Sequence, residues 1–64
     1  MKIIKITLEQ NIEIIERAFQ YGYQTSRDYI KLVYHGEKSL YRTREGYTIT
    51  FERDEDATWF LLNI

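Results

Sequence analysis

Residues 7–22 have the sequence TLEQNIEIIERAFQYG, and this stretch decides the predicted fold. Large apolar residues recur in it at spacings of four, three and four: Leu8, Ile12, Ile15 and Phe19. This period places them on one face of an α-helix. Thr7 and Gln10 form a capping-box pattern at its start, and Gly22 favours the left-handed conformation that ends helices. We therefore expect a helix from Leu8 to Tyr21 that buries this apolar row.

The other positions of this predicted helix fit the same picture. Ile14 and Ala18 widen the apolar row, and charged or polar residues fill the opposite side. Glu13 and Arg17 are four residues apart, the spacing at which an ion pair stabilises a helix by a few tenths of a kcal/mol.

Four short segments around the helix predict a sheet. Residues 2–7 (KIIKIT) open the chain with β-branched residues. Residues 29–35 (YIKLVYH), 39–44 (SLYRTR) and 47–52 (YTITFE) follow the helix, separated by turns at Gly36 and Gly46. The last three segments predict an antiparallel meander.

The segment 54–64 is ambiguous. Asp54, Glu55 and Asp56 suit the first turn of a helix, and Ala57 and Phe60 share one helical face. The alternative is a further hairpin strand with two apolar faces, and we favour the helix.

The predicted fold class is α+β, in the order β-α-β-β-β-α. Residues 1–64 form a single domain, with a four-stranded, mostly antiparallel sheet and the helices on one face. The residues expected in the core are Ile12, Ile15, Phe19, Ile30, Leu32, Ile49, Phe51 and Phe60.

The composition argues against an enzyme. The chain has no cysteine, so neither a disulfide nor a thiol nucleophile is possible, and His35 is the only imidazole. The acidic residues 52–56 lack the glycine and the spaced ligands of a calcium-binding loop. We therefore expect no catalytic residue, no metal site and no cofactor.

The sequence constrains the localisation and the partners less strictly than it constrains the catalytic chemistry. No secretory signal and no apolar run long enough to cross a bilayer is visible, which together with the missing cysteine favours the cytoplasm. The net charge of −1 predicts no overall attraction to nucleic acid.

A tyrosine-rich surface is the candidate functional site. Six of the 64 residues are tyrosine, a residue type enriched at protein interfaces. The predicted strands would display aromatic and basic side chains on and beside the uncovered sheet face: Tyr29, Lys31, His35, Tyr41, Arg42 and Arg44. Such a surface suits a protein partner, a second copy of the chain or single-stranded nucleic acid. The alternative is that tyrosine occupies these positions through β-propensity alone.

The C-terminal segment FERDEDATWFLLNI, residues 51–64, resembles a pattern in small accessory proteins of tailed bacteriophages. An acidic turn precedes Asp56 and Ala57, and Phe60 and Leu62 follow at matching positions. Leu61 and Asn63 depart from that pattern, which has basic residues there.

The resemblance implies a small non-catalytic phage-type protein that binds and modulates a host or viral protein in the host cytoplasm. It carries no catalytic residue across. The alternative function is a single-stranded nucleic-acid or RNA binding module that uses the tyrosine-bearing sheet face.

Overall fold

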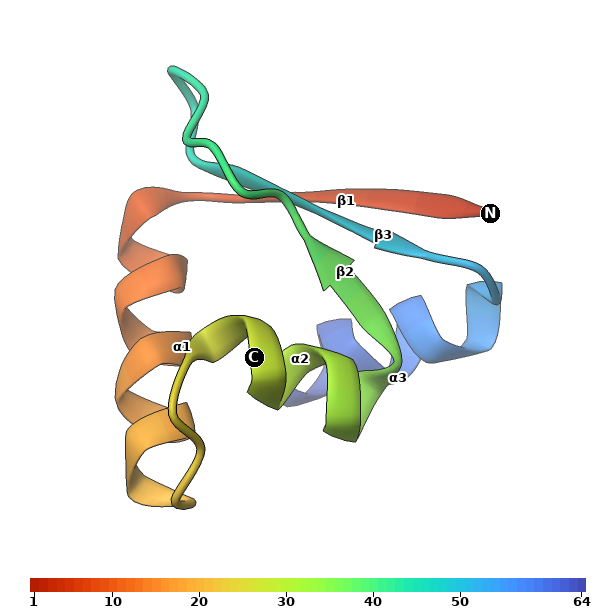
Figure 1. Cartoon of the computed structure of the whole chain (residues 1–64). Coiled ribbons are helices and arrows are strands. Elements are labelled where there is room, and N and C mark those ends of the chain that lie inside the picture. Colours follow the sequence, from red (N-terminus) through yellow and green to blue (C-terminus); the bar gives the residue numbers. More distant parts are fainter.

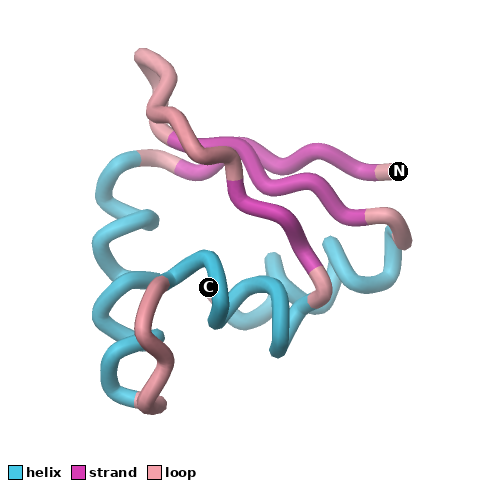
Figure 2. Tube along the Cα trace, viewed as in Figure 1, coloured by secondary structure: helices cyan, strands magenta, loops and turns pink.

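Three helices lie on one face of a three-stranded antiparallel sheet in the computed structural model, which describes all 64 residues (Figure 1). The elements in chain order are β1 (Lys2–Ile6), α1 (Leu8–Gln20), α2 (Ser26–Tyr34), β2 (Gly36–Lys38), β3 (Tyr47–Phe51) and α3 (Asp54–Asn63). Figure 2 shows the strands as one layer and the helices beneath it. The α+β class is confirmed, but the sheet has three strands and not the predicted four, and the order is β-α-α-β-β-α in place of the predicted β-α-β-β-β-α.

β3 is the central strand, with β1 and β2 antiparallel on either side of it. Alternate residues point toward the helices, and four of the apolar ones among these are buried: Ile4, Ile6, Ile49 and Phe51. The other face of the sheet is mainly polar and carries Ile3, Lys5, Glu37, Thr48 and Thr50. The sheet therefore contributes one apolar face to the core, as two-residue alternation requires.

The predicted start and end of α1 are confirmed. The Thr7 hydroxyl accepts a hydrogen bond from the Gln10 amide at 3.1 Å, and the Gln10 side chain accepts one from the Thr7 amide at 2.8 Å. Tyr21 caps the C-terminus, and Gly22 follows with a φ of 87°. The reciprocal cap satisfies two amides that the helix itself leaves without acceptors.

The prediction of a strand over residues 29–35 is wrong, because this segment forms most of α2. Thr25 caps the helix by accepting a hydrogen bond from the Asp28 amide at 3.1 Å. Tyr29, Ile30 and Tyr34 then follow on one buried helical face. His35 ends the helix in the left-handed conformation, with a φ of 59°. The segment satisfies both the two-residue and the helical period, and the cap at Thr25 decides between them.

The prediction of a strand over residues 39–44 is also wrong. Pairing between β2 and β3 covers Gly36 to Lys38, and the chain then leaves the sheet as an exposed loop. A short turn between Thr43 and Gly46 closes this loop. Gly36 is required at the start of β2, because a Cβ there would lie 2.6 Å from Cε1 of Phe51.

The C-terminal segment forms a helix, so the strand alternative is wrong. Asp54, Glu55 and Asp56 occupy the first turn of α3, where the helix dipole favours negative charge. Ala57 and Phe60 are buried against the sheet and α2.

Eleven residues form one hydrophobic core: Ile4, Ile6, Ile14, Ala18, Tyr29, Ile30, Tyr34, Ile49, Phe51, Ala57 and Phe60. Aromatic rings connect its parts, since Tyr34 lies 5.7 Å from Tyr29 and 5.2 Å from Phe60 between ring centroids. Edge contacts of this kind stabilise beyond the area they bury. Much of the tyrosine content is therefore core rather than surface.

The predicted core is half right. The four residues Ile30, Ile49, Phe51 and Phe60 are fully buried, as expected. The other four are exposed, which corrects the prediction: Ile12, Ile15, Phe19 and Leu32. Three of these exposed residues lie on α1, and they define the most unusual surface of the molecule.

Candidate protein-binding surface

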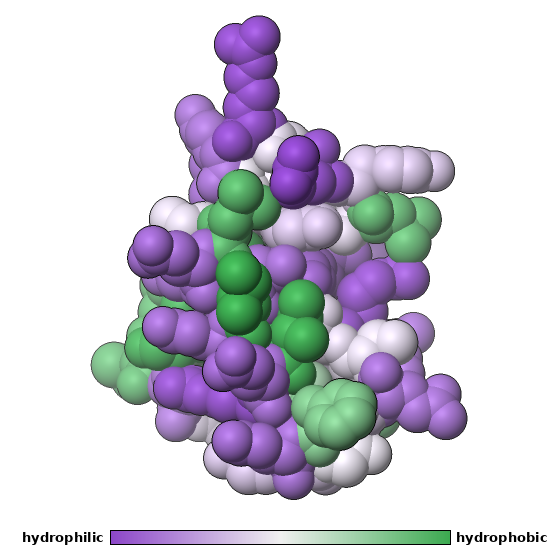
Figure 3. Space-filling view, turned by 90° about the vertical axis from the view of Figure 1, so that its left-hand side faces the viewer, coloured by the Kyte–Doolittle hydropathy of each residue, from purple (hydrophilic) through white to green (hydrophobic).

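α1 has two apolar rows, and the core takes only the narrower one. The inward row consists of Asn11, Ile14 and Ala18, all buried. The outward row consists of Leu8, Ile12, Ile15 and Phe19, which are 40%, 55%, 44% and 80% exposed. Figure 3 views the side of the molecule that α1 forms, and there green apolar side chains gather in a column among purple ones. Four large apolar side chains therefore face solvent along one helix.

Side-chain size explains why α1 presents Ala18 to the core and Phe19 to the solvent. Ala18 is small and is 1% exposed, so the helix backbone approaches the core closely at that position. Burying the outward row instead would place Phe19 where Ala18 now lies, and densely packed cores tolerate such added volume poorly. The sequence pattern predicted a single apolar row widened by Ile14 and Ala18, and it did not reveal that only the widened side faces the core.

An acidic ridge runs beside the outward row. Glu9, Glu13 and Glu16 are spaced by four and three residues, so they line one edge of the row. None of the three carboxylates takes part in an ion pair, and all three residues are exposed. The expected pair between Glu13 and Arg17 does not form, because the Arg17 guanidinium donates to the backbone carbonyl of Asn63 at the end of α3. The ridge therefore keeps its negative charge uncompensated.

The loop between β2 and β3, residues 39–46, carries the opposite charge. Leu40 and Tyr41 are 64% and 82% exposed, and Arg42 and Arg44 are exposed beside them. Gly46 packs this loop against the junction of β1 and α1, because a Cβ there would lie 2.0 Å from the carbonyl oxygen of Ile6. The loop consequently projects from the end of the molecule where α1 begins (Figure 1).

The structure divides the predicted binding surface into three places. Tyr29 is 4% exposed and belongs to the core, so its ring is not on the surface. Tyr41, Arg42 and Arg44 lie on the projecting loop. Lys31 and His35 lie at the other end of the β2–β3 hairpin, around a shallow depression. The predicted residues therefore do not form one continuous face.

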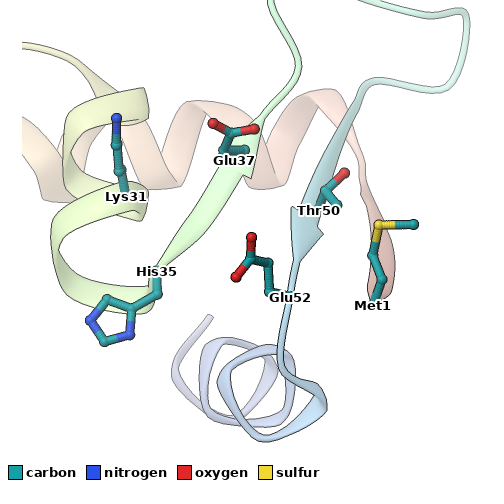
Figure 4. A pocket seen from close by; sticks show the side chains of 6 residues that line it. All are labelled: Met1, Lys31, His35, Glu37, Thr50 and Glu52. Atoms are coloured by element: carbon teal, nitrogen blue, oxygen red, sulfur yellow. The ribbon is translucent and has the colours of Figure 1, made fainter.

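That depression is open and has a volume of about 480 Å³. Figure 4 shows the six residues that line it: Met1, Lys31, His35, Glu37, Thr50 and Glu52. The His35 ring points away from the two glutamates, and its Nδ1 lies 3.7 Å from a carboxylate oxygen of Asp56. No group of three histidine, cysteine or acidic side chains is arranged to hold a metal ion. The depression carries mixed surface charge, and its one histidine is paired with the Asp56 carboxylate outside it.

One pair of chemically capable side chains was not expected from the sequence. The Lys38 Nζ donates to the Ser26 hydroxyl at 2.9 Å and lies 4.3 Å from the centre of the Tyr47 ring. Burial, together with the charge of Arg27, lowers the pKa of Lys38. A serine beside a lysine of lowered pKa has the elements of nucleophilic catalysis. Both residues are buried, and neither lines the depression.

Comparisons of the chain with protein-family models, with curated proteins and with solved structures give no match. No helix of this structure combines the length and the apolar character needed to span a membrane.

Proposed function

We propose that this chain is a small non-catalytic protein-binding domain that docks through the outward row of α1. The observation that carries the proposal is the exposure of Leu8, Ile12, Ile15 and Phe19 along one helix. Contiguous exposed apolar surface is costly in water and commonly marks a protein interface. Exposed apolar residues of α3, which are Trp59, Leu61 and Leu62, add further surface of the same kind.

The wider role we propose is that of a phage-type accessory protein that binds and modulates a host or viral protein in the cytoplasm. Its support is the C-terminal resemblance described above, together with the exposed apolar row of α1. Asp56 and Ala57 of that pattern lie in the first turns of α3, and Phe60 is buried in the core. Leu62 of the pattern is exposed and is free to contact a partner.

The alternative function, nucleic-acid binding, now depends on the projecting loop. The uncovered sheet face carries no tyrosine, so the expected stacking platform is missing from it. Tyr41, Arg42 and Arg44 remain exposed on the loop and suit a base and its phosphates. A protein partner would use the four exposed apolar side chains of α1, and for that reason we prefer it.

Site-specific photo-crosslinking tests the proposed interface. A photoreactive phenylalanine analogue placed at Ile12 should form a discrete adduct with another protein in the producing cells. The matched control carries the analogue at Glu37, which is exposed on the opposite side of the sheet from the helices. Adducts from position 37 but none from position 12 would contradict the proposal. So would adducts of position 12 with nucleic acid or with the chain itself alone.

A further inference from the structure

The outward row of α1 has the geometry of a helix-packing seam. Its spacings of four, three and four are those of alternating a and d positions in a heptad repeat. α1 has 13 residues and therefore presents a seam of about 20 Å, close to two heptads. Amphipathic helices bind such apolar surfaces through residues at matching spacings. The shape of the row thus favours a helix as its occupant.

The two edges of the seam differ in what they offer a partner. One edge is the domain itself, since Asn11 and Ala18 turn into the core beside the row. The other edge is the acidic ridge of Glu9, Glu13 and Glu16, which make no ion pair within the chain. A docked helix consequently meets three free carboxylates along one flank. Lysine or arginine on that flank would complement them.

A second copy of the chain fits this seam poorly. An antiparallel, two-fold symmetric pair would place Ile12 against Ile15 of the second copy, which is favourable. The same pairing would bring Glu9 close to Glu16 of the second copy, twice over by symmetry. Like charges at such positions oppose association. A parallel pair would need the Asn11 and Ala18 edge, which the core already occupies.

We infer that the occupant of the outward row is an amphipathic helix of a partner protein, with basic residues along the flank that faces Glu9, Glu13 and Glu16. This inference rests on the proposed function and specifies the partner for the same surface. The apolar seam supplies the contact, and the acidic ridge selects the charge and the orientation of the helix. Because the carboxylates are exposed, added salt should reduce the preference for a basic helix more than it reduces the affinity that the apolar contact provides.

Two synthetic three-heptad peptides test the inference on the intact chain. They share one leucine and isoleucine seam, and their flanking positions are lysine in one and glutamate in the other. At low salt the lysine peptide should bind at least about tenfold more tightly, and the shifted NMR resonances should cluster on α1. The triple variant Glu9→Lys, Glu13→Lys, Glu16→Lys should reverse this preference.

A control variant separates local from overall charge. Glu37→Lys, Glu45→Lys and Glu52→Lys change the net charge equally at exposed positions outside α1. This variant should keep the preference for the lysine peptide. If the lysine substitutions weaken α1, the triple glutamine variant at 9, 13 and 16 should still lose the preference.

Three outcomes would overturn the inference. They are equal affinity for both peptides, no binding of either, and self-association of the free chain that Ile12→Gln abolishes. The first two leave the crosslinking result at position 12 unaffected, so the proposed function would stand or fall separately. The third would assign the seam to a second copy.

Discussion

The two apolar rows of α1 differ in what they do for the molecule. The inward row of Asn11, Ile14 and Ala18 is narrow, contains one polar residue and is buried. The outward row of Leu8, Ile12, Ile15 and Phe19 is more apolar and is exposed. A helix optimised for folding alone would bury its larger apolar side chains. The fold therefore buries the smaller row of α1 and leaves the larger one exposed to solvent.

Burial of the inward row also has an unfavourable contribution to the free energy of folding. The side-chain oxygen of Asn11 is buried and has no hydrogen-bond partner. An unsatisfied buried acceptor is unfavourable, so the inward row contributes less stability than a fully apolar row would. Ile14 and Ala18 are the members of this row that belong to the hydrophobic core.

The largest predicted difference compares two phenylalanines. Phe51→Ala removes a ring that is fully buried under the sheet and should lower the free energy of unfolding by about 3–5 kcal/mol. Phe19→Ala removes a ring that is 80% exposed and should change it by less than about 0.5 kcal/mol. Urea denaturation of both variants measures the difference. Equal losses would show that Phe19 belongs to the core.

A second prediction uses pH to probe the buried side of α2, where Tyr29 lies. Burial, together with the adjacent Tyr34, raises the pKa of Tyr29 to about 12. The folded state therefore keeps this proton above pH 10, where the unfolded state loses it. The stability linked to Tyr29 is complete below about pH 10 and falls by about 2–3 kcal/mol as pH rises to 12.

The variant Tyr29→Phe isolates this effect. The lowered pKa of Lys38 has the opposite sign, because the unfolded state then binds the proton more tightly and stability rises toward pH 10. Lys38 and the other tyrosines are shared by both proteins, so they cancel in the difference between parent and variant. Identical alkaline unfolding curves for the two proteins would contradict the burial of the Tyr29 hydroxyl.

The smallest predicted effect concerns the N-terminal cap of α1. Thr7→Ala removes the acceptor of the Gln10 amide and should lower the free energy of unfolding by about 1 kcal/mol. Thr7→Ser keeps the hydroxyl and serves as the control. A loss of the same size in both variants would mean that the hydroxyl is not the stabilising group.

Local signals predicted the elements that local interactions decide. The capping box at Thr7, the alternation of β3 and the acidic first turn of α3 each identify their element. The apolar residues of 29–35 fit both the two-residue period of a strand and the period of a helix. Only the cap at Thr25, one turn upstream, distinguishes the helix from the strand. Residues 39–44 have strand-forming side chains, but the Ser39 amide makes the last backbone hydrogen bond to β3, at 2.8 Å to the Thr48 carbonyl, and the residues after it form the loop that returns to β3.

The candidate site could not be predicted from the sequence, for a different reason. The apolar pattern located the outward row but predicted it in the core, because a helix with two apolar rows does not reveal which one packs. Burial of Tyr29 likewise follows from contacts with Tyr23 and Tyr34, whose rings lie 5.3 and 5.7 Å away. Such contacts depend on tertiary packing, which overrides local propensity.

Two isoleucines on α1 test most directly whether the inward row stabilises the fold and the outward row does not. Ile14 is 2% exposed on the inward row, and Ile12 is 55% exposed on the outward row. Urea denaturation should show that Ile14→Ala lowers the free energy of unfolding by about 2–4 kcal/mol, whereas Ile12→Ala changes it by less than about 1 kcal/mol. A larger loss for Ile12→Ala than for Ile14→Ala would mean that the outward row holds the fold together, and the proposed binding surface would then not exist.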